Sequence, residues 1–285
     1  MRRPLRLTVL VLALVACLCL YYYHVENAVR VETVQFQSRL VGKTLPYDVV
    51  LPRGYGLLTA RGTRYPVLYL LHGWGGSHSS WISESSLVRY AAQHQLIIVT
   101  PEGGDNWYTD GASSGADKYE TYVLQELIPD VENRFRTLKN RGGRAVAGYS
   151  MGGYGALKFA FKHPEVFTLA ASMSGAFDAA TRTDDPSIMR IFGEAGGPTR
   201  EANDLFKLAR ELPRERARQL PFLYLDCGTE DPWTAANREM SGIFLERGIV
   251  HEYRQLRGAH VWPYWDRQLP EILSLTEEML LPAQP

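Results

Sequence analysis

Short apolar segments alternate with amphipathic ones along most of the chain. Six segments predict β-strands, and most of them are continuous apolar runs of the kind that parallel sheets bury on both faces. They cover residues 66–71, 96–99, 144–149, 168–173, 222–226 and 250–256. Helices are predicted between and after these strands, over 83–94, 118–136, 151–162, 233–247 and 265–280. This alternation predicts an α/β fold with a mostly parallel central sheet and helices on both faces.

Two further segments complete the predicted domain. Residues 31–40 and 45–51 are rich in β-forming residues and flank Gly42 and Lys43, which predicts an N-terminal hairpin. Residues 176–220 mix helical stretches with Pro and Gly breaks, and they could form a small helical insertion that caps the sheet.

The first 28 residues follow a different pattern. Three arginines within the first six residues precede an apolar run over 7–23, and the first acidic residue is Glu26. A basic flank before an apolar stretch is typical of a secretory signal or a membrane anchor. Cys17 ends a motif similar to a lipoprotein cleavage box, but the residues after it stay apolar, which favours an anchor or a cleaved signal. We therefore expect residues 29–285 to form an extracytoplasmic domain, with the N-terminal segment as its contact with the membrane.

Composition narrows the classes of protein further. With 285 residues, of which 45% are hydrophobic and 22% charged, the chain is long enough for one large globular domain. The 31 basic and 31 acidic side chains balance, which argues against a nucleic-acid partner, because phosphate binding needs a basic excess. Beyond residue 28 the one cysteine is Cys227, and no His/Cys cluster has metal-ligand spacing. We expect no disulfide within the domain, no metal and no cofactor.

One serine lies where a nucleophile would be exposed. Residues 148–152 (GYSMG) fit the nucleophile-elbow pattern Gly-x-Ser-x-Gly, and Ser150 falls at the junction of a predicted strand and a predicted helix. A second match over 111–115 places Ser113 in a polar loop with no strand before it. We therefore interpret Ser150 as the nucleophile and Ser113 as a loop residue.

A serine nucleophile needs a base, and the base needs an orienting carboxylate. With a nucleophile elbow, these partners follow the serine in the order acid, then histidine, on loops after late strands. His260 follows the strand predicted over 250–256, and the strand over 222–226 leads to three candidate acids. Asp231 is our choice, Glu230 the second candidate, and Asp226 belongs to the strand or its end.

The reaction also needs N–H donors for the developing oxyanion. The backbone N–H of Met151, which follows the nucleophile, is one expected donor. The second should come from the glycine-rich turn after the strand over 66–71, where Trp74 is our candidate and Gly73 the alternative. We expect Gly73, Trp107 and Tyr108 to line the substrate pocket.

Taken together, these segments resemble the putative-esterase branch of the α/β-hydrolases. That branch includes esterase D (S-formylglutathione hydrolase), feruloyl and acetyl-xylan-type esterases, and mycobacterial mycolyltransferases. The likeness extends over nearly everything from about residue 31 onward. The segments that carry it are 65–73, 119–120, 126–132, 148–155, 226–231 and 258–265.

The resemblance implies an α/β-hydrolase fold with Ser150 as nucleophile, Asp231 as acid and His260 as base. We also expect Trp262, close to this histidine, to contact substrate. Val261 departs from the family pattern, in which Asp or Ser often follows the histidine. We expect a serine carboxylesterase acting on a small-molecule, carbohydrate or lipid ester. The alternatives are an acyltransferase to a sugar or lipid alcohol, an S-formylglutathione hydrolase-like thioesterase, and a non-catalytic surface protein on a hydrolase scaffold.

Overall fold

The structure, a computed structural model, describes residues 3–112 and 117–284. Its centre is an eight-stranded sheet with the order β1-β2-β4-β3-β5-β6-β7-β8. The strands are β1 (Arg30–Val34), β2 (Tyr47–Leu51), β3 (Val67–Leu71), β4 (Ile97–Pro101), β5 (Arg144–Tyr149), β6 (Leu169–Met173), β7 (Phe222–Gly228) and β8 (His251–Leu256). Strands β3 to β8 are parallel, whereas β2 is antiparallel to β1 and β4. The predicted mostly parallel sheet and N-terminal hairpin are confirmed.

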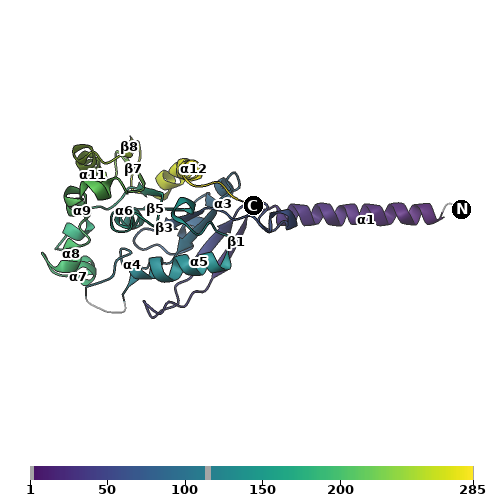
Figure 1. Cartoon of the computed structure of the whole chain (residues 1–285), viewed down its shortest axis with the longest axis horizontal. Coiled ribbons are helices and arrows are strands. Elements are labelled where there is room, and N and C mark those ends of the chain that lie inside the picture. The colour runs from purple at the N-terminus through teal and green to yellow at the C-terminus, as the bar shows by residue number, and fades with distance from the viewer. Residues whose placement is uncertain (1–2, 113–116, 285) are drawn as a thin grey trace.

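Apart from the first helix, which precedes β1, and the last, which follows β8, the helices lie between the strands along the chain (Figure 1), as the alternation in the sequence predicts. They are α1 (Arg3–Glu26), α2 (Ser80–Glu84), α3 (Leu87–Ala91), α4 (Tyr119–Tyr122), α5 (Ile128–Arg134), α6 (Met151–Lys162), α7 (Pro186–Phe192), α8 (Pro198–Glu201), α9 (Leu205–Glu211), α10 (Arg214–Ala217), α11 (Thr234–Arg247) and α12 (Trp262–Met279). A π-helical turn, Val123–Leu127, joins α4 to α5, so the helix predicted over 118–136 is essentially continuous.

Side chains of the strands alternate between two hydrophobic cores. In β3, Val67, Tyr69 and Leu71 belong to one core, and Leu68 and Leu70 to the other. The first core is completed by α5, α6 and α11, and the second by α3 and α12. Because successive residues of a strand point to opposite faces, a strand buried on both faces must be apolar throughout. This is why the continuous apolar runs predicted the strands.

The helix predicted over 83–94 is instead two short helices, α2 and α3. Ser85 between them has an extended backbone (φ −133°, ψ 174°), and its hydroxyl donates to the carbonyl of Trp81. The backbone N–H of Ser86 donates to Asp266 of α12 at 2.6 Å. Such side-chain hydrogen bonds compete with those of a helix backbone, and here they interrupt it.

The segment over 176–220 forms a short 3₁₀ turn (Ala179–Thr181) and helices α7 to α10. Helix α9 packs against α6 and α11. The hydroxyl of Tyr154 in α6 donates to the backbone carbonyl of Asn203 at 2.7 Å. The segment therefore packs on the helix that follows Ser150.

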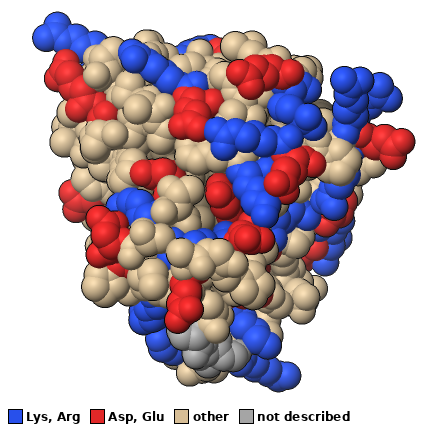
Figure 2. Space-filling model, turned by 90° about the vertical axis from the view of Figure 1, so that its left-hand side faces the viewer, with Lys and Arg blue, Asp and Glu red and all other residues tan. Residues whose placement is uncertain are grey.

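The two ends of the molecule differ in surface chemistry. Helix α1 projects from the domain, and its exposed side chains include Leu20 and Tyr21. Within the part of the chain that the structure describes, no helix has both the length and the apolar character needed to cross a bilayer. The opposite end of the molecule carries interspersed acidic and basic side chains (Figure 2).

Two glycines let β5, α6 and the end of β3 approach closely. A Cβ atom on Gly152 would lie 2.4 Å from the carbonyl oxygen of Leu71, and one on Gly148 would lie 2.5 Å from the backbone of Gly152. No side chain larger than hydrogen fits at either position without moving the backbone. The flanking glycines of the elbow are therefore required by the packing of the sheet against α6.

We expect Gly152→Ala to lower the free energy of unfolding by about 3 kcal/mol or more, because the added methyl group meets backbone that cannot rotate away. The matched control is Gly242→Ala in α11, where a Cβ would have no neighbour within 4 Å. That control should gain roughly 1 kcal/mol from helix propensity. Urea unfolding of both variants tests this, and equal stability of Gly152→Ala and the unaltered protein would contradict it.

Candidate active site

Ser150 lies at a sharp turn between β5 and α6. Its backbone has φ 55° and ψ −116°, an uncommon conformation for a residue with a side chain. Its N–H donates to the carbonyl of Met173 in β6 at 2.9 Å, and its own carbonyl accepts from Tyr154 at 3.0 Å. These bonds hold the turn at the edge where the parallel strands end. Met151 is the first residue of α6, where backbone N–H groups have no partner within the helix and can face an anion.

His260 and Asp231 lie on loops at the same edge. His260 Nε2 is 3.0 Å from Ser150 Oγ, and His260 Nδ1 is 2.9 Å from Asp231 Oδ2. We assign the proton to Nδ1, because that nitrogen faces a carboxylate and leaves Nε2 free to accept from the serine hydroxyl. Asp231 is buried, and its other oxygen accepts from the backbone N–H of Trp233 at 2.8 Å. The Trp265 ring lies edge-on to the imidazole at 4.9 Å.

The two other candidate acids lie elsewhere. Glu230 is solvent-exposed and pairs with Arg257 at 4.0 Å. Asp226 is buried in β7, where it accepts from the hydroxyl of Tyr264 at 2.9 Å, and burial raises the pKa of its carboxyl to about 7. The geometry therefore selects Asp231 as the carboxylate that faces the imidazole.

The glycine-rich turn after β3 is held by neighbouring loops. Fully buried His72 bonds to the carbonyl of Gly73 at 2.8 Å through Nδ1, and its Nε2 accepts from the N–H of Gly103 at 2.9 Å. The N–H of Gly75 donates to Asp105 at 2.6 Å. A Cβ on Gly73 would collide with the ring of Tyr149 at 2.4 Å. The turn thus has little room to move beside Ser150.

A cleft of about 590 Å³ opens on Ser150 and His260. Trp74 and Trp262, both expected near the site, line it. It is also lined by Ser80, Glu84, Tyr149 and Trp265, which we did not predict. Tyr149 could have been found from its place next to the nucleophile, but no sequence signal places α2, which carries Ser80 and Glu84, beside this loop. The volume is in the range of small-molecule sites.

Gly73, which we expected to line the pocket, is not among the residues that line this cleft, and neither are Trp107 and Tyr108. Both have a left-handed backbone (φ 55° and 51°), and the Tyr108 side chain is fully buried, with its hydroxyl donating to the carbonyl of His72 at 3.1 Å. The ring of Trp107 lies 6.0 Å from that of Trp74 and 5.4 Å from that of Tyr154. Our expectation that they face substrate is therefore corrected: they pack behind the turn that carries Trp74. The second elbow-like match, around Ser113, lies largely outside the described residues.

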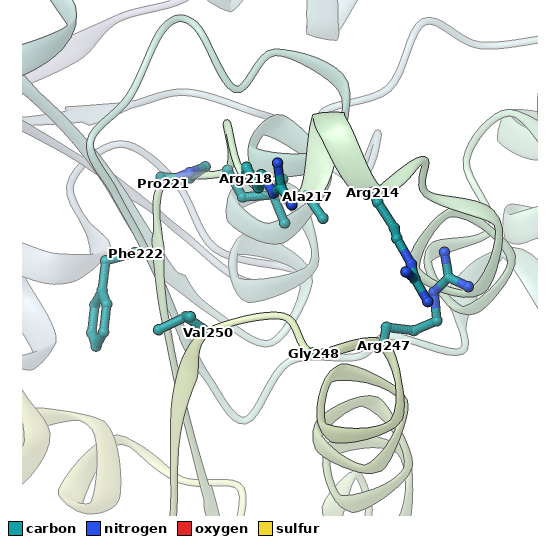
Figure 3. A pocket seen from close by; sticks show the side chains of 9 residues that line it. Arg214, Ala217, Arg218, Pro221, Phe222, Arg247, Gly248 and Val250 are labelled. Carbon is teal, nitrogen blue, oxygen red and sulfur yellow. The ribbon is translucent and has the colours of Figure 1, made fainter.

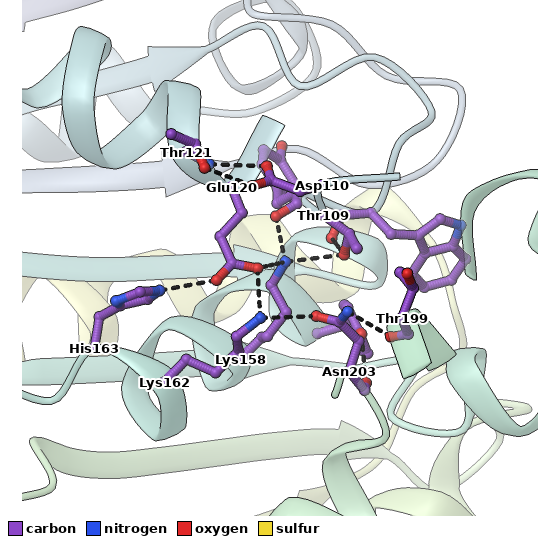
Figure 4. A network of polar contacts seen from close by, with 12 residues as sticks. Thr109, Asp110, Glu120, Thr121, Lys158, Lys162, His163, Thr199 and Asn203 are labelled. Atoms are coloured by element: carbon purple, nitrogen blue, oxygen red, sulfur yellow. Dashed lines mark hydrogen bonds and ion pairs between the residues drawn. The ribbon is translucent and has the colours of Figure 1, made fainter. Parts of the chain in front are cut away.

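A buried ionic network keeps Trp107 and Tyr108 in place (Figure 4). The ammonium group of Lys158 in α6 is fully buried and donates to the carbonyl of Tyr108 and to Thr109 Oγ1 at 2.9 Å. It pairs with Glu120 of α4 at 3.0 Å. Burial lowers the pKa of Lys158 to about 8, against the opposing effect of Glu120. One lysine therefore joins α6 to the loop behind the glycine-rich turn.

Glu120 receives two more cationic or potentially cationic partners. Lys162 lies 2.9 Å from its carboxylate, and His163 Nε2 lies 2.8 Å away. Burial by itself would raise the pKa of Glu120, but Lys158, His163 and Lys162 outweigh that effect and hold the pKa well below its usual range. Lys162 also donates to the side chain of Asn203 at 3.2 Å, which extends the network into the segment over 176–220.

A cavity lined by arginines is remote from Ser150. A cavity of about 440 Å³ is lined by Arg214, Arg218 and Arg247 around an apolar floor (Figure 3). Its floor includes Phe222, the first residue of β7, so it lies at the edge where the parallel strands begin. Ligands of open α/β sheets bind at the opposite edge, where Ser150 lies.

We expect Glu120→Gln to lower the free energy of unfolding at pH 7 by about 3 kcal/mol, because Lys158 stays buried without a counter-charge. The pKa of Glu120 is lower in the folded state than the 4.5 of the free side chain. Its stabilising effect is therefore complete above that pH and is lost as the pH falls through the folded-state pKa. Urea unfolding should show the gap between the two proteins narrowing with acidification, and a constant gap would contradict this.

Comparisons with known proteins identify the family of the chain. The model of the family described as putative esterase matches residues 38–276. Esterase Rv1288 of Mycobacterium tuberculosis is 33% identical over 264 residues, which cover 83% of this chain and 57% of that protein. The chain thus spans just over half the length of this curated relative.

Solved structures of esterases and related serine hydrolases share the fold. A ferulic acid esterase superposes with a TM-score of 0.78 at 26% identity, covering 89% of this chain and all of that one. The fluorophosphonate-binding serine hydrolase FphF of Staphylococcus aureus superposes with a TM-score of 0.79 at 25% identity, covering 87% of this chain and 98% of that one. The fold is therefore that of the α/β-hydrolases, and the chain belongs to the putative esterase family.

Proposed function

We propose that the protein is a serine carboxylesterase in which Ser150, His260 and Asp231 form the catalytic triad. The observation that carries the proposal is the continuous hydrogen-bond relay from Ser150 Oγ through the imidazole to the buried Asp231 carboxylate, at 3.0 and 2.9 Å. A serine hydroxyl becomes nucleophilic when an imidazole can take its proton, and the imidazole needs a carboxylate to orient it. The family and the relatives named as esterases support the same activity.

The proposed reaction has two halves. Ser150 Oγ attacks the ester carbonyl while His260 Nε2 takes its proton, and the imidazolium then protonates the leaving alcohol as the ester bond breaks. Water adds to the acyl-enzyme by the same proton transfers and releases the acid. The N–H of Met151 and an N–H of the glycine-rich turn, from Trp74 or Gly73, stabilise the tetrahedral oxyanions. If an alcohol attacked the acyl-enzyme in place of water, the enzyme would be an acyltransferase. The products formed with added alcohol distinguish hydrolysis from acyl transfer.

We also propose that the enzyme acts outside the cytoplasm. The support is the basic start and apolar run of residues 1–28, a pattern typical of exported proteins. Among the described side chains of α1, Leu12, Leu18 and Leu20 are exposed and belong to neither core of the domain, as expected of a segment that serves export rather than folding.

Replacing the nucleophile should abolish the reaction. We expect Ser150→Ala to reduce hydrolysis of p-nitrophenyl acetate to background and to abolish labelling by a fluorophosphonate probe, with no change in the far-UV spectrum. Ser113→Ala, in the second Gly-x-Ser-x-Gly match, is the control and should retain full turnover. Unreduced turnover in Ser150→Ala would refute the assignment.

The choice of acid can be tested separately. We expect Asp231→Asn to lower kcat by roughly 10³- to 10⁴-fold, because an amide in place of the carboxylate favours the wrong imidazole tautomer. Glu230→Gln removes a neighbouring carboxylate that does not contact His260, so it should leave kcat within about twofold. Steady-state kinetics with p-nitrophenyl acetate give both values, and the reverse order would assign the acid to Glu230.

A further inference from the structure

The cleft at Ser150 carries one carboxylate and no Lys or Arg side chain among the residues that line it. The carboxylate is that of Glu84, the last residue of α2. It accepts a long hydrogen bond from the hydroxyl of Ser83 at 3.5 Å, and it makes no ion pair within the described part of the chain. A solvent-facing carboxylate without a cation leaves the cleft with a negative potential.

Aromatic rings form much of the remaining wall. Trp262 and Trp265 meet nearly at right angles, with an interplanar angle of 85° and ring centroids 5.3 Å apart. The ring of Tyr149 lies 4.8 Å from Trp262 and 4.2 Å from Trp265. Trp74, on the glycine-rich turn, lines the same cleft and is 43% exposed. The faces of such rings attract cations, and several rings together with a carboxylate are the usual surroundings of a bound ammonium group.

The position of His260 indicates which part of an ester lies here. In the proposed reaction, His260 Nε2 hands its proton to the oxygen of the leaving alcohol. His260, Val261, Trp262 and Pro263 all line the cleft. An alcohol that receives this proton therefore leaves past the same loop, next to the Trp262 ring.

From these observations, and resting on the proposed esterase activity, we propose that the cleft selects esters whose alcohol carries a positive charge. Glu84 supplies the counter-charge, and Trp262 supplies the aromatic wall for a quaternary or protonated amine. Esters whose alcohol or thiol part is anionic are repelled by the Glu84 carboxylate and are disfavoured. The cleft therefore differs from a site that binds an anionic thiol ester.

A pair of esters with the same shape tests the proposal. Acetylcholine and its neutral carbon analogue, with a tert-butyl group in place of trimethylammonium, share the acyl group and differ in charge. We expect kcat/KM to be higher for acetylcholine in the unaltered protein. Glu84→Gln should lower the ratio of the two kcat/KM values roughly fivefold, and Trp262→Ala should lower it as well. Glu230→Gln, which removes an exposed carboxylate outside the cleft, should leave the ratio unchanged.

Binding without turnover provides the second measurement. Choline should bind the Ser150→Ala protein in calorimetry and bind more weakly when Glu84→Gln is added, and the difference should shrink in high salt, which screens exposed charges. A ratio insensitive to Glu84→Gln, or a preference for the neutral ester, overturns the charge selection while leaving the esterase proposal intact. Failure to hydrolyse either ester, together with no fluorophosphonate labelling, refutes the esterase proposal, and choline binding then tests the cation site alone.

Discussion

The contact between the start of α6 and the end of β3 is the constraint on which the site depends. Gly152 brings the helix so close to the carbonyl of Leu71 that a methyl group would lie 2.4 Å from that oxygen. The chain between β5 and α6 must then turn within one residue, and Ser150 takes up that turn at φ 55°. The hydrogen bond from the Ser150 N–H to Met173 of β6 helps to hold this strained turn, which presents the hydroxyl above the sheet edge. Because the strands are parallel, β7 and β8 also end at this edge, and the loops that follow them bring Asp231 and His260 there.

The ionic network of Lys158 and Glu120 stabilises the loop that carries Trp107 and Tyr108. Trp107 and Tyr108 both adopt left-handed backbones, which nonglycine residues rarely do without support. Lys158 provides that support by bonding to the Tyr108 carbonyl, and Glu120 balances the buried charge. Replacing such a pair by apolar residues can leave a protein equally stable, so stability alone is a weak reason for its presence. An apolar pair would not supply the hydrogen bond from Lys158 that holds this loop to α6.

Sequence reasoning succeeded where the signal is local or follows from chain order. Apolar runs predicted the strands because burial on both faces leaves no other choice, and the order Ser150, Asp231, His260 placed three groups at one edge. It failed where a contact distant in sequence decides the conformation. Asp266 interrupts the helix predicted over 83–94 from 180 residues away. Trp107 and Tyr108 were predicted to line the pocket because aromatic residues in a polar loop suggest binding. They are buried instead, and Lys158, which bonds to the Tyr108 carbonyl, lies 50 residues away in the sequence, where nothing predicts this contact.

Reactivity depends on residues whose chain order predicts their position, whereas selectivity depends on contacts between residues distant in sequence. The proposed triad could be predicted from the sequence because, in a fold with a nucleophile elbow, the acid and the histidine follow the serine on loops after late strands. The wall opposite them comes from α2 and from the first turn of α12, whose positions depend on the second hydrophobic core and on the bond from Ser86 to Asp266. A change at Glu84 would therefore not disturb the hydrogen bonds between Ser150, His260 and Asp231. The cavity lined by Arg214, Arg218 and Arg247 lies at the opposite edge of the sheet, whereas Glu84 is the one carboxylate among the residues that line the cleft at Ser150, so a charged substrate there would meet Glu84 and the aromatic rings around it.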